Sequence, residues 1–128
     1  MGPPLAARFH EAGANVFEAT GPLDDESNLE EALRVCPDPE VLLANLAAGP
    51  SPAAVGDIAD KDWNALFDVM VHPLMKLVRA FAPGMLKRGT GKIVAITSAA
   101  PLRGIPGTSA YCAARGAQNA FVRAAGLE

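Results

Sequence analysis

Short apolar runs of strand length alternate along this chain with longer stretches of helical periodicity, and this alternation limits the possible folds more than any other feature. The expected elements, in chain order, are a helix over 3–12, a strand over 14–19, a helix over 24–36, a strand over 41–46, a helix over 60–91, a strand over 91–98 and a helix over 109–127. Apolar strands that alternate with helices are typical of a parallel sheet covered on both faces. The sequence therefore predicts an α/β fold with three strands and four helices.

The longest expected helix carries apolar residues three and four positions apart, as a helix with one buried face requires. Pro73 lies inside it, and because proline has no N–H to donate, we expect the helix to bend there. The 128 residues are half hydrophobic and one-fifth charged, which suits one globular domain over 1–128.

Charge and hydropathy bear on the partners and the location of the protein. The formal net charge is −3 and the basic residues are scattered, which gives no reason to expect nucleic acid or an anionic membrane as a partner. No apolar run has the length of a membrane span, and the first residues lack the pattern of a secretory signal. We therefore expect a cytoplasmic protein.

Cysteines and histidines give little support for a metal site. Cys36 and Cys112 lie far apart and outside any CxxC pattern, so we expect two free thiols. His10 and His72 have no acidic or thiol neighbour at metal-ligand spacing in the sequence.

The residues that carry chemistry lie near the end of the chain. Tyr111, the only tyrosine, and Arg115 are four residues apart in an expected helix and so share one face. A phenol titrates near ~10 in isolation, and a neighbouring cation favours its ionised form, so the pair could exchange a proton near neutral pH. Ser98 ends an expected strand, where open α/β sheets bind ligands, and its hydroxyl could hold a substrate oxygen. Each residue alone could equally serve packing or solvation, and it is the combined spacing that favours catalysis.

The stretches "GKIVAITSAAP" and "GTSAYCAARGAQNAF" resemble the active-site segment of the short-chain dehydrogenase/reductase superfamily. That superfamily uses serine, tyrosine and lysine at these spacings, and the resemblance extends over nearly the whole chain. It implies a Rossmann-like, doubly wound parallel sheet and a small-molecule substrate. It also implies a homodimer or homotetramer assembled through the helices at 62–88 and 109–127.

Several residues depart from the oxidoreductases of that superfamily. Arg115 stands where they have lysine, and a planar guanidinium is not equivalent to a compact ammonium group. Met70 stands where the superfamily has an asparagine, and Thr20 where members that bind NAD have an acid. The superfamily's "NNAG" motif is here the segment 44–47.

The residues that would bind a nicotinamide cofactor are also unusual. Only Gly2 remains of the glycine-rich turn, and Pro3 and Pro4 remove two of the N–H donors on which a pyrophosphate would rest. The same two prolines also simply suit a helix start. Asn45, after the second expected strand, could contact a bound ligand or only a loop. Under an oxidoreductase interpretation, Gly2 and Asn45 are the cofactor-binding residues.

The halohydrin dehalogenases are similar in fold but use serine, tyrosine and arginine and bind no nicotinamide. This chain resembles them in Ser98, Tyr111 and Arg115, and in the stretches "MVHPL" and "LLANLA". The resemblance implies that Tyr111 deprotonates a vicinal halo-alcohol whose oxygen is held by Ser98, and that the alkoxide displaces the halide to form an epoxide without a redox cofactor. The alternatives are an NAD(P)-dependent oxidoreductase, in which Tyr111 protonates a carbonyl oxygen, and an inactive fragment or relative that acts only through assembly.

The resemblance begins in mid-motif and stops before the superfamily's last strands. We therefore expect a single incomplete domain over 1–128 that lacks the first and last strands of the sheet. The missing first strand would lie between the strands expected at 14–19 and 41–46. Since backbone groups would otherwise stay unpaired, we expect the chain alone to be marginally stable or dependent on assembly, and inactive by itself.

Overall fold

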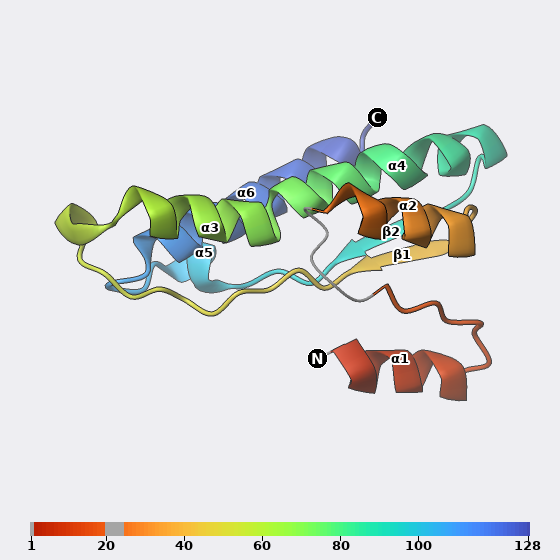
Figure 1. Cartoon of the computed structure of the whole chain (residues 1–128), viewed down its shortest axis with the longest axis horizontal. Helices are drawn as coiled ribbons and strands as arrows, with labels where there is room; N and C mark the ends of the chain where they lie inside the picture. The colour runs from red at the N-terminus through yellow and green to blue at the C-terminus, as the bar shows by residue number, and fades with distance from the viewer. Residues whose placement is uncertain (1, 20–24) are drawn as a thin grey trace.

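The computed structural model describes residues 2–19 and 25–128. These residues form six α-helices, one short 3₁₀-helix and two strands (Figure 1). In chain order the elements are α1 (Gly2–Glu11), α2 (Glu26–Val35), β1 (Val41–Ala44), η1 (Val55–Asp57), α3 (Asp60–Met70), α4 (His72–Arg88), β2 (Lys92–Ala95), α5 (Ala100–Arg103) and α6 (Ser109–Ala125).

The two strands form a parallel pair. Val41 lies opposite Lys92, and Ala44 lies opposite Ala95. Helices α2, α4 and α6 lie on one side of the pair and α1 lies on the other (Figure 1). A parallel sheet with helices on both sides is the arrangement of a doubly wound fold, so the predicted class, a partial Rossmann-like α/β fold, is confirmed.

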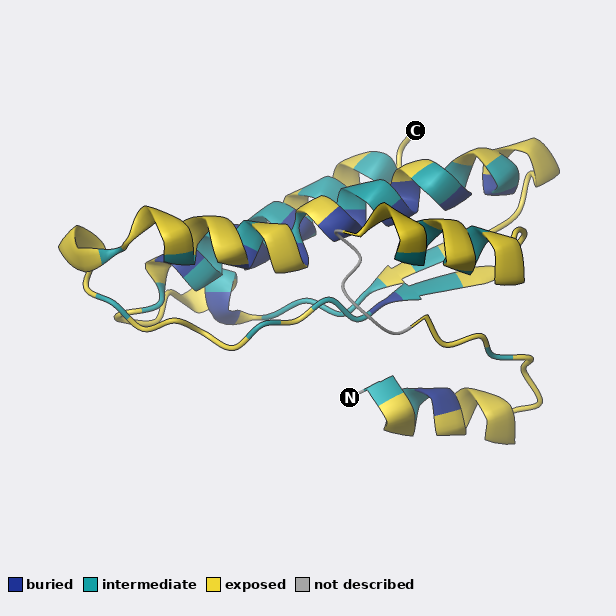
Figure 2. Cartoon of the chain, in the orientation of Figure 1, coloured by how far each residue is buried: buried dark blue, intermediate teal, exposed yellow. Residues whose placement is uncertain are grey.

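Two buried clusters hold the helices in place. Ala44 of β1 packs against Leu74, Leu77, Val78 and Phe81 of α4. The second cluster joins α3 to α6 and consists of Leu66, Met70, Ala110 and Ala114. The buried residues follow the inner faces of these helices (Figure 2). The second cluster packs one face of α6 against α3. This packing fixes where α6 lies relative to the ends of the strands.

The long helix expected at 60–91 is divided. It is interrupted at Val71, two residues before Pro73, which is the second residue of α4. Because Pro73 has no N–H, it cannot continue the helical ladder across this point. At the other end, Gly89 adopts a φ of 68° and donates its N–H to Leu86 at 3.0 Å, which ends α4 at Arg88. No helix of the described residues is long and apolar enough to cross a membrane.

The strand expected at 14–19 is wrong. The segment has no regular structure, and all of it except Val16 is exposed. A strand is stable only beside a hydrogen-bonding partner, and in the described part of the chain β1 and β2 pair only with each other. The expectation of three strands and four helices is corrected accordingly, and the other two strands are shorter than expected, with four residues each.

The expectation that His72 has no acidic neighbour at metal-ligand spacing is also wrong. Its Nδ1 lies 3.0 Å from Oδ1 of Asp68, one helical turn earlier. The two side chains are more than half exposed, and no group of three potential metal-ligating side chains occurs among the described residues. The pair is therefore a surface contact across the interruption between α3 and α4.

Candidate active site

The carboxyl ends of β1 and β2 lie side by side, because the two strands are parallel and in register. The chain leaves this edge through Asn45 and Leu46 on one side and through Ile96 to Ser98 on the other. Helix α6 passes the same edge, so the expected site residues of the sheet and of the helix converge there.

Tyr111 and Arg115 are in contact. Arg115 donates a hydrogen bond from Nε to the Tyr111 hydroxyl oxygen at 3.1 Å, and its guanidinium carbon lies 5.3 Å from the centre of the phenol ring. Such a contact between a cation and a ring is attractive. The helical spacing therefore places the two side chains together, as the sequence predicts.

The guanidinium of Arg115 is buried, with only 4% of the residue exposed. Its Nη1 donates to the main-chain oxygens of Leu46 at 3.0 Å and Ile96 at 3.2 Å. It also donates to the side-chain oxygen of Gln118 at 2.9 Å. Arg115 thus links α6 to the chain at the exits of both strands.

Ser98 lies at the same edge but does not contact the pair. Its Oγ accepts a hydrogen bond from the N–H of Ala100 at 3.1 Å, at the start of α5. Among the described residues, no hydrogen bond joins Ser98 to Tyr111 or Arg115. The Oγ accepts from the main chain, which leaves the hydroxyl proton free to be donated to another oxygen.

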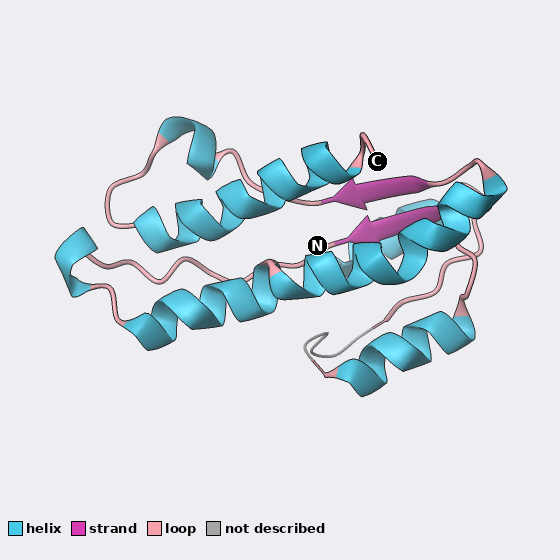
Figure 3. Ribbon diagram, turned by 90° about the horizontal axis from the view of Figure 1, so that it is seen from above, coloured by secondary structure: helices cyan, strands magenta, loops and turns pink. Residues whose placement is uncertain are grey.

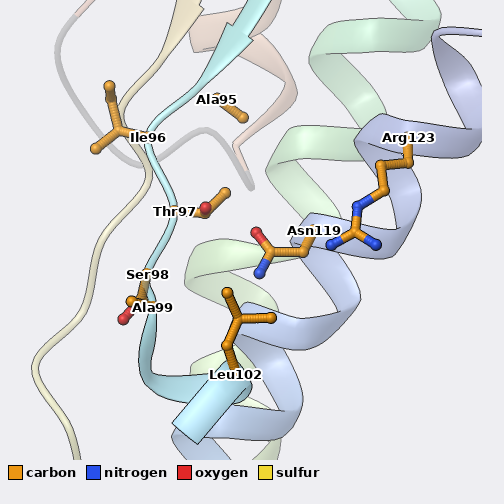
Figure 4. A pocket seen from close by; sticks show the side chains of 8 residues that line it. All are labelled: Ala95, Ile96, Thr97, Ser98, Ala99, Leu102, Asn119 and Arg123. Carbon is orange, nitrogen blue, oxygen red and sulfur yellow. The ribbon is translucent and has the colours of Figure 1, made fainter.

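An open hollow of about 500 Å³ borders Ser98 on the side of β2. Its lining residues are Ala95, Ile96, Thr97, Ser98, Ala99, Leu102, Asn119 and Arg123. Asn119 and Arg123 reach toward it from α6, whereas the Ser98 oxygen points away from them (Figure 4). Tyr111 is not among the lining residues, so this hollow and the Tyr111–Arg115 pair are different places.

Gly2 and Asn45 lie close together. A Cβ added to Gly2 would stand 4.0 Å from the side-chain nitrogen of Asn45. The side-chain oxygen of Asn45 is buried, and no donor to it is found in the part of the chain that the structure describes. The first turn of α1 thus meets the carboxyl end of β1. Thr20, the other expected departure in this region, lies outside the described residues.

Gln118 belongs to the site, and the sequence analysis missed it. It is 1% exposed and touches both Arg115 and the main-chain oxygen of Met70. The sequence could have indicated Gln118 by its position, which is three residues after Arg115 on a helical face that otherwise carries Ala110 and Ala114. A lone amide on an apolar helical face requires buried partners.

A comparison with known families identifies the chain. The family model for the short chain dehydrogenase matches residues 3–128. The chain belongs to the short-chain dehydrogenase family. Three similar proteins illustrate what this family contains, and the chain spans about half the length of each of them.

The NADP-dependent 3-hydroxy acid dehydrogenase YdfG of Salmonella typhi is 34% identical over 93% of this chain and 48% of its own length. A solved structure described as a "Dehalogenation enzyme" has a TM-score of 0.70 and 31% identity, over 93% of this chain and 48% of that one. The gluconate 5-dehydrogenase from Burkholderia cenocepacia, solved with NADP and tartrate, has a TM-score of 0.74 and 25% identity, over 94% of this chain and 49% of that one. The names of these relatives favour oxidoreductase chemistry over the dehalogenase interpretation that Arg115 suggests.

Proposed function

We propose that this chain carries the proton-transfer residues of an NAD(P)-dependent short-chain oxidoreductase that acts on a carbonyl or alcohol. The observation that carries the proposal is the hydrogen bond from the buried Arg115 guanidinium to the Tyr111 hydroxyl at the carboxyl edge of the sheet. The names of the relatives support the redox class, because they include an NADP-dependent dehydrogenase and a dehydrogenase solved with NADP.

In this proposal Tyr111 gives its hydroxyl proton to the carbonyl oxygen of the substrate during reduction and recovers a proton during oxidation. A guanidinium that donates to the phenol oxygen stabilises the negative charge that proton release leaves there. Ser98 donates a hydrogen bond from its hydroxyl to the same substrate oxygen, since its Oγ already accepts from Ala100. The two hydroxyls would then orient the substrate oxygen from two elements.

Near the start of α1, Asn45 fits a bound dinucleotide, whereas Pro3 and Pro4 fit it less well. The buried Asn45 oxygen without a donor suits a ligand hydroxyl. In the first turn of α1, Gly2 has an N–H to offer, whereas Pro3 and Pro4 have none. Gly2 and Asn45 would therefore hold the cofactor, with fewer donors to its phosphates than a glycine-rich turn offers. When bound, NAD(P) supplies or accepts the hydride.

The second candidate is a halohydrin dehalogenase. It is favoured by Arg115, which binds two main-chain oxygens at the strand exits, and by the similarity to the dehalogenation enzyme. In that reaction Tyr111 takes the hydroxyl proton of the halo-alcohol. The alkoxide oxygen then bonds to the neighbouring carbon, and the halide leaves with the electrons of the carbon–halogen bond.

One pair of assays separates the two candidates. Because the chain spans about half the length of its relatives, a full-length version is mixed with NADH or NADPH and a series of ketones, and separately with a vicinal halo-alcohol. We expect loss of the reduced nicotinamide signal in the first assay and no halide release in the second. Halide release without nicotinamide binding would favour the dehalogenase, and neither signal would reject both.

The variant Tyr111→Phe tests the role of the hydroxyl. It keeps the ring and removes only the group that exchanges the proton, so we expect kcat to fall by about 10²–10⁴-fold. Phe17→Tyr, which adds a hydroxyl to a ring that is 49% exposed in the segment 14–19, is the matched control and should keep the wild-type rate. An unchanged rate in Tyr111→Phe would remove Tyr111 from the mechanism.

A further inference from the structure

The charge of Arg115 is buried without a carboxylate. None of the ion pairs among the described residues includes Arg115, although only 4% of the residue is exposed. A buried charge is tolerated when neighbouring dipoles satisfy it. Here the dipoles are the main-chain oxygens of Leu46 and Ile96 and the side-chain oxygen of Gln118.

The orientation of the Gln118 amide follows from its partners. Its nitrogen lies 2.7 Å from the main-chain oxygen of Met70 and 3.5 Å from that of Leu46. Main-chain oxygens only accept hydrogen bonds, so the amide nitrogen must face them. The amide oxygen is then the atom that faces the guanidinium, at 2.9 Å. This orientation leaves no polar atom of the amide unused.

Gln118 also offers the shortest of the three contacts to Nη1, since the main-chain oxygens of Leu46 and Ile96 lie at 3.0 and 3.2 Å. Nη1 carries two hydrogens, so three acceptors compete for them. The amide oxygen therefore restrains how far the guanidinium plane can turn. The same plane contains the Nε–H that Arg115 donates to Tyr111.

We propose that Gln118 is a positioning residue that holds the Arg115 guanidinium so that its Nε–H points at the Tyr111 hydroxyl. The anchor of this arrangement is the Met70 oxygen at the end of α3, just before the interruption of the long helix. The proposal rests on the proposed role of Tyr111 in proton transfer. A side chain that served packing alone would instead be replaceable by an apolar one of equal length.

The first experiment does not depend on any enzymatic activity. The exchange of the Arg115 Nε–H with solvent is measured by ¹⁵N NMR, after its signal has been identified by its loss in Arg115→Lys. Gln118→Met keeps the side-chain length and removes the hydrogen bonds, and we expect exchange to quicken by about tenfold or more, as the loss of a hydrogen bond to a charged group implies. Asn64→Met, which removes an exposed amide from α3, should leave the exchange unchanged.

Gln118→Glu is the conservative variant and also serves if Gln118→Met does not fold. It loses the donor to the Met70 oxygen but places a charged acceptor beside the guanidinium, and a charge-assisted hydrogen bond is stronger than a neutral one. We therefore expect its exchange rate to stay within about threefold of wild type, much closer than that of Gln118→Met. If Nε–H exchange is the same in the wild type and Gln118→Met, or is as fast in Gln118→Glu as in Gln118→Met, the positioning role is wrong.

A double-mutant cycle on kcat/KM connects the position to the reaction. If Gln118 acts through the guanidinium, Gln118→Met should lower kcat by about tenfold in the wild type with little change in KM, and should have much less effect in Arg115→Lys. Equal effects in both backgrounds would overturn the proposal. If a full-length version shows no turnover of carbonyl or halo-alcohol, the proposed function fails, while the NMR result still decides the position of Arg115.

Discussion

At the scale of single residues, Arg115 is held by neutral oxygens whose own hydrogen bonds depend on it. Leu46, Ile96 and Gln118 each direct an oxygen at Nη1. Removing the guanidinium removes a buried charge, which can be favourable, but it also takes a donor from each of these oxygens and leaves Leu46 only the Gln118 amide at 3.5 Å. The second effect should dominate here, because three acceptors stay behind.

Arg115→Met tests this balance. We expect the free energy of unfolding to fall by about 1–3 kcal/mol, because buried acceptors lose their donor. Urea unfolding followed by circular dichroism measures it, with Arg103→Met, at an exposed position of α5, as the control. Equal stability of the two variants would mean that the oxygens find other donors.

The residues of the site could be predicted from the sequence only where local geometry decides. The contact between Tyr111 and Arg115 follows from a spacing of four residues in one helix, so it is correct. The partners of Gln118 lie 48 and 72 residues away along the chain, and no local pattern indicates them. Ser98 lies at the predicted strand end, but its contact with Ala100 depends on the short helix α5, which is not among the elements expected from the sequence.

At the scale of the elements, helices agree with their sequence patterns better than strands do. Helical hydrogen bonds are internal, so periodicity and end residues are sufficient to predict α2 and α6 closely. The segment 14–19 has a composition suited to a strand, but a strand also needs a neighbour, which local composition does not supply. The interruption at Val71 again follows from one residue, Pro73, which has no N–H.

The start of α2 should make stability depend on pH. Asp25 accepts hydrogen bonds from the side chain and main-chain N–H of Ser27, at 2.8 and 2.9 Å, and these bonds hold the pKa of Asp25 below its ordinary value. A carboxylate whose pKa is lowered by folding stabilises the folded state above its unfolded pKa, and this contribution is lost as pH falls through the folded pKa.

Asp25→Asn separates this titration from the cap itself, because asparagine also caps helices but has no charge to lose. We expect the wild type to lose stability below about pH 4 more steeply than the variant. Thermal unfolding of both proteins between neutral and acid pH measures the difference. Parallel pH curves would show that Asp25 does not contribute.

Gly91, between α4 and β2, should tolerate no side chain. A Cβ there would stand 2.4 Å from Cγ and 2.6 Å from Cβ of the buried Met85. Because the Cβ of Met85 cannot move without its helix, Gly91→Ala should lower the free energy of unfolding by about 1–3 kcal/mol. Gly49→Ala, where nothing lies within 4 Å, is the matched control in denaturant unfolding, and equal midpoints would contradict the expectation.

At the scale of the whole molecule, apolar side chains remain exposed on two surfaces. Val41 and Val94 belong to the two parallel strands, which lie side by side in Figure 3, and each is 41% exposed. On α3, Trp63 is 39% exposed and stacks on Phe67 with the ring centres 5.1 Å apart. A two-stranded sheet is marginally stable by itself, so covering these surfaces in an assembly would add stability.

We therefore expect the protein to assemble into a homodimer or homotetramer through the helices at 62–88 and 109–127, and its stability to depend on its concentration. Association that occurs only in the folded state raises the midpoint of unfolding as protein concentration rises. The fluorescence of Trp63, the only tryptophan, follows both unfolding and contact at this surface.

Trp63→Lys places a charge where an apolar contact is expected. It should therefore lower the assembly mass in sedimentation and abolish the concentration dependence of unfolding. Val55→Lys, at a position 82% exposed on η1, should do neither. A midpoint that stays constant over a hundredfold range of concentration, in a protein that sediments as a monomer and unfolds with several kcal/mol typical of small domains, would show that the exposed surfaces need no partner.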